Sequence, residues 1–390
     1  MDKPAIIGGK PQFSEPVQFL RPPISRYADS AAEDFKAILK SNMITNFSTV
    51  EKLENEIGKY LGCGTVALNS CTSGLMLSAN ILGLKNQEVI LPSFTFCATA
   101  LAMTWNNCRL KFVDIDEETF NISPEKVEEA ITPNTKAIVG VHVFGNPCKA
   151  DELMQIAEDH DLKLLFDSAG GFASSYKEKK VGNFGNAESF STGPSKIFCT
   201  IEGGILSSKD DELLKKIKLA RNYGILKNYD LVYHGMSARM EEVNAAIGLR
   251  YMKDIDMYLN NRNDYAKRYL QNLKNIKGIS FQRIENNSVS NYKDFAIIID
   301  PKVFGMERDI FVEALEKENI LVKKYFYPPL HKTTIYKEHS SLKLPATERV
   351  AANIVCLPLY NIMENKLIDN ISQAIIKIHS HAREIPGKLG

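Results

Sequence analysis

The residue with the clearest chemical potential is Lys196, in the segment SFSTGPSKIFCTIEGGILSS (189–208). Small and apolar residues surround it, and the segments on either side are typical of buried strands. A lysine that is partly removed from water loses its proton more readily, which suits it for forming an imine with a carbonyl compound. The alternative is a lysine in a solvated loop, which is the common environment of this residue type.

A second candidate is the segment LNSCTSGLMLSANIL (68–82), whose pattern predicts a strand, a turn and a helix. The turn residues SCTSG (70–74) fall at the N-terminus of that helix. Exposed N–H groups and the positive end of the helix dipole make such a turn suitable for binding phosphate. The same residues could instead form a plain helix N-cap.

Two further segments place a carboxylate and aromatic rings directly after predicted strands. In LLFDSAGGF (164–172), Asp167 ends an apolar strand, and ligands of open α/β sheets bind outside such carboxyl ends. In PSFTFCATA (92–100), Phe94 and Phe96 follow another strand. Asp167 could instead cap the next turn, and aromatic residues in such positions are commonly part of the core.

The order of these features along the chain matches what pyridoxal phosphate requires of a protein. That cofactor needs donors for its phosphate, a flat contact for its ring, a carboxylate on its pyridinium nitrogen and an amine for a Schiff base. The chain offers the 70–74 turn, Phe96, Asp167 and Lys196 in that order, with Ser191 five residues before the lysine. The set therefore predicts a pyridoxal phosphate site.

Short strands that are apolar throughout alternate with helical segments over the first 240 residues. AIVGVHVF (137–144) and LKLLFD (162–167), for example, flank the helical pattern KADELMQIAEDH (149–160). Strands without polar alternation indicate a sheet covered on both faces, and the alternation of strand and helix predicts an α/β fold with a mostly parallel sheet. A further helix is predicted over 123–131, with Ser123 as its N-cap.

The pattern changes after residue 240. Residues 241–273 predict one long helix or two abutting ones, and the remainder predicts a smaller α+β unit from the segments 292–300, 308–320 and 365–379. We therefore predict a large domain over 1–260, which includes the N-terminal segment, and a small C-terminal domain over 261–390. A cleft between two domains is a common small-molecule site.

Composition argues against several other classes of protein. The formal net charge is +1, so no overall field favours nucleic acid or an anionic membrane. The seven cysteines show no C-x-x-C pair or zinc spacing, so we predict no metal site and a reducing compartment. The sequence shows no signal-peptide pattern and no apolar run near the roughly 20 residues that span a bilayer. We expect a cytoplasmic protein.

Several segments of this chain resemble the DegT/DnrJ/EryC1/StrS family. They are EVILPSFTFCATA, VDIDEETFNISPEKVEEAITPNTKAIVGVHVFGNP, FDSAGG, SFSTGPSKIFCTIEGG and YFYPPLH, and the similarity runs from about residue 6 to about 380. The resemblance implies a pyridoxal-phosphate aminotransferase of the aspartate-aminotransferase fold (fold type I). The opening GGKPQF and the YFYPP segment are most similar to members that aminate nucleotide-linked 4-keto-6-deoxy sugars. Glutamate is then the expected amino donor, and amino-sugar biosynthesis the expected process.

The resemblance also implies roles for individual residues. Lys196 would form the Schiff base, Asp167 would pair with the pyridinium nitrogen, and Phe96 would stack on the ring. The remaining implied site residues are Thr72 and Ser73 (backbone N–H groups to the phosphate), Ser191 (hydroxyl to the phosphate), Glu202 (start of the loop after the lysine), His331 (substrate side) and Ser237 (from the partner subunit of a homodimer, within 235–239).

Three positions depart from the family pattern. Cys71 stands within a turn that is commonly S-G-T, Gly170 stands where His or Gln is usual, and Ser237 replaces a common Asn. The last two changes affect the cofactor pocket and leave two alternatives open. One is a pyridoxal-phosphate enzyme with a different outcome or acceptor, such as a dehydratase or an enzyme of non-nucleotide keto sugars. The other is a non-catalytic, cofactor-binding regulator. Family members that became dehydratases lack the lysine that is present here as Lys196.

Overall fold

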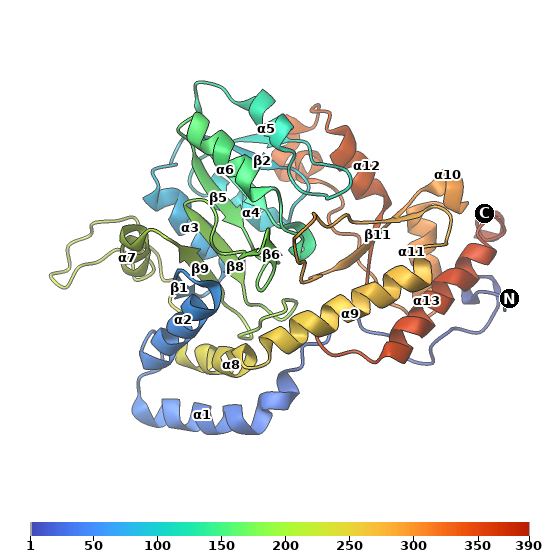
Figure 1. The fold of residues 1–390 in the computed structure, drawn as a ribbon, viewed down its shortest axis with the longest axis horizontal. Coiled ribbons are helices and arrows are strands. Elements are labelled where there is room, and N and C mark those ends of the chain that lie inside the picture. Colours follow the sequence, from blue (N-terminus) through green and yellow to red (C-terminus); the bar gives the residue numbers. More distant parts are fainter. Residues whose placement is uncertain (1, 390) are drawn as a thin grey trace.

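The computed structural model describes residues 2–389 and consists of two units joined by one long helix (Figure 1). The large unit contains a seven-stranded sheet of order β1-β9-β8-β5-β4-β2-β3. Its strands are β1 (Gly64–Leu68), β2 (Glu88–Pro92), β3 (Arg109–Val113), β4 (Thr135–Val141), β5 (Lys163–Asp167), β8 (Ala187–Ser191) and β9 (Gly204–Ser208). Strand β9 is antiparallel to β1 and β8, and the other pairs are parallel. The predicted α/β fold with a mostly parallel sheet is confirmed.

Helices cover both faces of this sheet. One face carries α3 (Cys71–Ile81), α4 (Cys97–Thr104) and α7 (Asp211–Ala220), and the other carries α2 (Ser48–Leu61), α5 (Pro124–Ala130), α6 (Ala150–Asp159) and α8 (Glu242–Met252), with α1 (Ala28–Ser41) packed outside α8. Successive residues of β4 enter opposite cores, since Ala137 and Val139 belong to one cluster and Ile138 to the other. Burial on both faces explains why the central strands are apolar throughout.

The C-terminal unit is built around a three-stranded antiparallel sheet of order β10-β11-β12. Its elements are β10 (Ile279–Phe281), β11 (Phe295–Ile299), β12 (Ile354–Leu357), α10 (Pro301–Phe304), α11 (Arg308–Lys317), α12 (Pro345–Asn353), α13 (Asn365–Ser380) and α14 (Pro386–Leu389). The joining helix is α9 (Ile255–Leu273), in which Tyr258 enters the large core and Tyr265 the small one. The predicted boundary at residue 260 lies between these two tyrosines.

The N-terminal segment packs differently from our prediction, which assigned it to the large unit. Val17 forms a bridge with Ile320 and belongs to the C-terminal core. The buried Glu318 carboxylate accepts hydrogen bonds from the backbone N–H groups of Ala5 at 2.8 Å and Gln12 at 2.7 Å. These bonds hold the segment to α11 of the small unit, a long-range contact with no local sequence signal.

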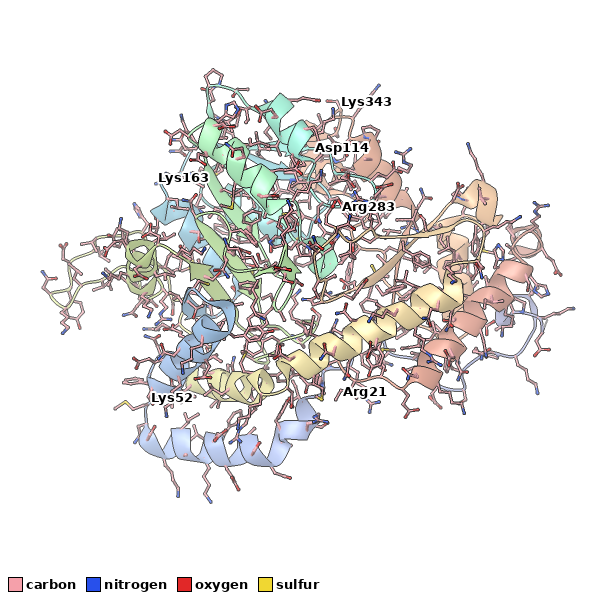
Figure 2. The ribbon with its side chains drawn as sticks, viewed as in Figure 1. Arg21, Lys52, Asp114, Lys163, Arg283 and Lys343 are labelled. Atoms are coloured by element: carbon pink, nitrogen blue, oxygen red, sulfur yellow. The ribbon has the colours of Figure 1, made fainter. Side chains whose placement is uncertain are left out.

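Asp114 forms a second link between the two units (Figure 2). It follows β3 of the large unit, and its carboxylate accepts hydrogen bonds from the backbone N–H groups of Ala346 at 3.0 Å and Thr347 at 2.8 Å, at the start of α12. A carboxylate at this place satisfies N–H groups that a helix leaves unpaired. Asp114 therefore fixes α12 against the sheet.

The remaining short elements are the hairpin of β6 (Ser175–Tyr176) and β7 (Lys179–Lys180) and the 3-10 turns η1 (Ala5–Ile7), η2 (Ile24–Tyr27), η3 (Val143–Gly145), η4 (Leu330–Lys332) and η5 (Thr334–His339). None of the helices within residues 2–389 has the length and apolar character needed to cross a membrane.

Candidate active site

A cavity of about 330 Å³ lies where the carboxyl ends of the central strands face the C-terminal unit. Six of the site residues predicted from sequence line it: Thr72, Phe96, Asp167, Ser191, Lys196 and Glu202. The C-terminal unit contributes Lys293 and Asp294, just before β11, and Tyr325 and Phe326. The cavity thus brings together residues as far apart in the chain as Ser70 and Phe326, a separation of 256 positions.

The N-terminus of α3 forms one end of the cavity. Ser70 caps this helix, because its Oγ accepts a hydrogen bond from the backbone N–H of Ser73 at 3.1 Å. Ser73 Oγ donates to Asn69 Oδ1 at 2.7 Å, so the Ser73 side chain is used within the turn. Of the two residues predicted to bind phosphate, Thr72 lines the cavity, whereas Ser73 is buried within the turn and does not line it. The segment therefore forms an N-capped helix start whose first turn also lines the cavity.

A glycine allows the turn and the sheet to approach closely. A Cβ on Gly204, the first residue of β9, would lie 2.2 Å from the Ser70 carbonyl carbon. No real Cβ tolerates that distance, so the second glycine of the E-G-G sequence is required for packing. The K-x5-E-G-G spacing thus brings the strand after the lysine directly against the turn at α3.

Asp167 ends β5, and its side chain is buried in the cavity wall. Oδ2 accepts a hydrogen bond from Thr99 Oγ1 at 2.6 Å, and Oδ1 accepts one from the Ala169 backbone N–H at 3.0 Å. The Cys71 thiol lies 3.8 Å from Oδ1 and donates to the Ser189 carbonyl at 3.1 Å. Burial raises the pKa of this thiol well above its ordinary value, so Cys71 is neutral beside the carboxylate. Thr99 is a site-supporting residue that the sequence analysis missed.

Lys196 lines the same cavity, so it is not the solvated loop lysine that was the alternative interpretation of its sequence context. Burial, together with the charge of Lys293, lowers the pKa of its amine to about 8. Asp294, Cys71 and Asp167 act in the opposite direction. An amine with a pKa near 8 exists partly as the neutral nucleophile at physiological pH, whereas an exposed lysine does not.

The two phenylalanines after β2 have different environments. Phe94 is fully buried and packs edge-on against Phe120, Phe144 and Phe326. Phe96 is 58% exposed and lines the cavity, with its ring 6.4 Å from that of Phe326. Phe94 is therefore a core residue, and Phe96 is the ring that a bound ligand can contact.

Besides Ser73, two predicted site residues lie outside the cavity wall. His331 is buried, with Nδ1 at 2.7 Å from Ser93 Oγ and Nε2 at 3.1 Å from Glu348 Oε1. Burial lowers its pKa. Ser237 lies beside the strand that leads into the α3 turn, where its carbonyl accepts a hydrogen bond from Asn69 Nδ2 at 3.3 Å. In this single chain neither residue contacts the cavity.

His142 is a cavity residue that sequence reasoning did not single out. Its ring stacks on Phe166 with centroids 5.1 Å apart, and its Nδ1 accepts a hydrogen bond from the Cys148 backbone N–H at 3.1 Å. Because Nδ1 accepts, Nε2 carries the proton and faces Glu188 Oε2 at 3.3 Å. These contacts with Phe166, Cys148 and Glu188 therefore fix the orientation of the imidazole ring. The only sequence signal was its position at the end of an apolar strand.

Comparison with known proteins adds a family to this geometry. The model of the DegT/DnrJ/EryC1/StrS aminotransferase family matches residues 26–376. The dTDP-4-amino-4,6-dideoxy-D-glucose transaminase of Escherichia coli is 33% identical over 345 residues, which cover 87% of this chain and 92% of that protein. The UDP-4-amino-4,6-dideoxy-N-acetyl-beta-L-altrosamine transaminase of Campylobacter jejuni is 30% identical over 308 residues, covering 77% and 81%.

A solved structure resembles the whole chain. The crystal structure of DesI in the presence of its TDP-sugar product superposes with a TM-score of 0.92 at 29% sequence identity. It covers 99% of this chain and 98% of that one. The predicted recognition of the family and of its fold is thereby confirmed.

Proposed function

Because the chain belongs to the DegT/DnrJ/EryC1/StrS aminotransferase family, we propose that it transfers an amino group from glutamate to a keto group of a nucleotide-linked sugar, with pyridoxal phosphate as cofactor. The family activity makes the chain an aminotransferase. The observation that carries the proposal is the position of Lys196: a half-buried lysine with a lowered pKa in one cavity with Asp167 and the N-terminus of α3.

The residues around the cavity fit pyridoxal phosphate. The first turn of α3 and the Ser191 hydroxyl offer donors for a phosphate, and Asp167 offers a buried carboxylate for a ring nitrogen. Phe96 offers a flat face, and Lys196 offers the amine for covalent attachment. When bound, the cofactor supplies an aldehyde carbon and a ring that accepts electrons.

The protein's own contribution is charge placement and proton transfer. Asp167, fixed by Thr99 and the Ala169 N–H, presents a negative charge that favours a protonated ring nitrogen. Lys196 Nζ can take up and release a proton near neutral pH because its pKa is about 8. Asp167 is buried and Lys196 is half-buried, which limits the access of bulk water to the reacting atoms.

The sugar acceptor is proposed from the relatives. The Escherichia coli and Campylobacter jejuni proteins are named as transaminases of a dTDP-linked and a UDP-linked amino sugar. The similarity covers most of each chain, so we extend the nucleotide-sugar class to this protein. We also propose a homodimer in which Ser237 serves the partner's site, and a substrate-side role for His331, exerted through Ser93 at the start of the Phe94–Phe96 segment.

The experiment that tests this function uses purified protein, pyridoxal phosphate and glutamate. The cofactor-loaded protein should absorb visible light, and glutamate alone should shift the spectrum and release 2-oxoglutarate. Lys196→Ala should abolish turnover and the covalent cofactor that borohydride fixes. Lys163→Ala, which changes an exposed lysine at the start of β5 (Figure 2), should alter neither readout. Transamination by the Lys196→Ala protein would refute the assignment.

The acceptor is tested in a second step. The protein first exposed to glutamate and then freed from it should convert a panel of dTDP- and UDP-linked 4-keto-6-deoxy sugars to amino sugars. Release of 2-oxoglutarate without any amino sugar from this panel would retain the cofactor chemistry and reject the proposed acceptor class.

A further inference from the structure

A second lysine in the cavity, Lys293, is not explained by the proposed chemistry. Its ammonium lies 2.9 Å and 2.8 Å from the two carboxylate oxygens of Asp294, the next residue in the chain. The Lys293 side chain is 10% exposed and the Asp294 side chain 4%. Both residues line the cavity that holds Lys196. Buried charges are uncommon unless they are paired, and a pair turned toward a ligand cavity is more often functional than structural.

The backbone that carries Lys293 is fixed from two sides. Its N–H donates to the Phe144 carbonyl at 2.8 Å, and its carbonyl accepts from the buried guanidinium of Arg262 at 3.3 Å. Arg262 also donates to the Tyr292 carbonyl at 2.9 Å. The backbone of Lys293 is therefore fixed, and its ammonium can change position only by rotation of the side chain. The Tyr325 ring centroid lies 5.3 Å from this ammonium.

Gly170 provides the room for this lysine. A Cβ built on Gly170 would lie 3.5 Å from Lys293 Cβ and Cγ, in van der Waals contact with the stem. Any longer side chain at position 170 would compete with Lys293 for this space. Gly170, which departs from the family pattern, and Lys293 are thus neighbours in the cavity wall.

We propose that Lys293 donates an N–H to a carboxylate of the amino-acid donor while it stays paired with Asp294, and that the pair alone neutralises its charge when the sugar takes the donor's place. This proposal rests on the proposed transaminase function. Among the cavity-lining residues, the lysines are Lys196 and Lys293, and Lys196 is committed to the cofactor in the proposed function. An ammonium has three N–H donors, and the two oxygens of Asp294 leave at least one for a ligand.

A lysine paired with a carboxylate suits a site that must hold an anionic amino acid in one half-reaction and a neutral sugar ring in the other. The donor amino acid brings carboxylates, whereas the reacting ring of a sugar brings only hydroxyl and keto groups. A fixed cation would remain unpaired and buried when the sugar is present, which is unfavourable. With Asp294 adjacent, the Lys293 charge is compensated in both half-reactions.

The diphosphate of a nucleotide sugar is the other anion that Lys293 could meet. Two features favour the carboxylate. Asp294 beside the lysine would repel a diphosphate, which carries two negative charges, more strongly than a single carboxylate group. The cavity volume of about 330 Å³ must already hold the cofactor, which leaves room for a small amino acid in preference to a diphosphate near Lys293.

The test measures each half-reaction separately in the cofactor-loaded enzyme. Lys293→Gln shortens the side chain by one atom and keeps a donor N–H for Asp294, but it removes the charge. We expect its apparent affinity for glutamate to fall about tenfold to a hundredfold, the effect of losing a charge-assisted hydrogen bond. Calorimetry with glutarate, a dicarboxylate that cannot react, should show the same loss. The affinity of the amino-loaded enzyme for the keto sugar should change by less than about twofold.

Three variants complete the design. Lys293→Arg should restore most of the glutarate affinity because it keeps the charge. Asp294→Asn frees the ammonium, so glutarate should bind at least as tightly as to the wild type. Lys163→Gln, an exposed lysine outside the cavity, should leave both affinities unchanged.

The outcomes separate the possibilities. Lower affinity for the sugar with normal glutarate binding would assign Lys293 to the diphosphate and overturn the proposal. Unchanged affinity for both ligands, or an equal loss of glutarate affinity in Asp294→Asn, would make the pair structural and also overturn it. If the wild type releases no 2-oxoglutarate from glutamate, the proposed function fails, while glutarate calorimetry still reports on Lys293. Should Lys293→Gln not retain the cofactor, the Arg and Asn variants decide.

Discussion

At the scale of single residues, the site is defined by an amine that the fold holds in an unfavourable state. Lys196 is half-buried in the cavity wall, and the loss of solvation there lowers its pKa to about 8 from the ordinary 10.5. Below pH 8 the lysine is protonated in both the folded and the unfolded chain, so the folded state carries the full cost of a buried charge. That cost corresponds to about 3 kcal/mol. The amine that the proposed chemistry requires therefore lowers the free energy of unfolding.

This cost can be measured in the protein without its cofactor. Lys196→Met replaces the amine by an apolar side chain of similar length, so the free energy of unfolding at pH 7 should rise by up to about 3 kcal/mol. Between pH 8 and 10.5 the native wild type loses its proton before the unfolded chain does, so wild-type stability rises with pH. The advantage of the variant should therefore shrink across this range. Urea unfolding at several pH values checks both expectations.

The exposed Lys163 provides the control, since Lys163→Met removes no buried charge and should show no comparable pH-dependent gain. A Lys196→Met protein that is less stable than the wild type at pH 7 would contradict the inferred cost. It would mean that Asp167 and Asp294 stabilise the ammonium more than burial destabilises it.

At the scale of elements, local sequence signals predict some helix termini and miss others. The N-terminus of α5 was predicted, because Ser123 and Pro124 are adjacent in the chain, and Ser123 Oγ does accept from the Lys126 N–H at 3.2 Å. The N-terminus of α2 is capped from nearly 200 residues away. There the Glu242 carboxylate accepts from the backbone N–H groups of Phe47, Thr49 and Val50 at 2.7, 2.8 and 3.0 Å. No local pattern can reveal such a cap.

Glu242 should therefore contribute strongly to stability. Its side chain is buried at the start of α8, and it is the link between α8 and α2. Glu242→Ala would leave three buried or half-buried N–H groups without their acceptor, which should lower the free energy of unfolding by about 3 kcal/mol. The midpoint of urea unfolding measures this loss.

The neighbouring Glu241 is exposed and offers a matched control. Glu241→Ala removes the same charge from the adjacent position and should change stability by less than about 0.5 kcal/mol. Equal effects of the two substitutions would contradict the capping role of Glu242.

At the scale of the whole molecule, the part of the site that could be predicted is the part built by the strand ends of one sheet. Thr72, Phe96, Asp167, Ser191 and Lys196 follow strands whose apolar pattern is visible in the sequence, and all five line the cavity. Lys293 and Tyr325 could not be predicted in this way, because they enter the cavity only through the packing of the C-terminal unit. The N-terminal segment was assigned to the wrong unit for the same reason.

The segment between α7 and α8 is a candidate contact surface for the proposed homodimer. Figure 1 shows it extending away from the body of the large unit. Tyr229 is 87% exposed and Leu231 is 68% exposed, so large apolar side chains stand at its end. Exposed apolar groups that project from a folded body are typical of an interface. The same segment leads to Ser237, which we propose to serve the partner's cofactor site.

The double substitution Tyr229→Asp and Leu231→Asp tests this association. Two charges at the end of the segment should prevent burial against a second chain, so light scattering after gel filtration should give a monomer where the wild type gives a dimer. The helical signal in circular dichroism should stay unchanged, because both side chains are exposed in the single chain. Cofactor affinity should fall at least tenfold if the partner completes the phosphate site. Lys227→Asp, on the same segment, adds negative charge without removing an apolar group and should remain dimeric. A double variant that is still dimeric would place the interface elsewhere, and a monomeric variant with full cofactor affinity would remove Ser237 from the site.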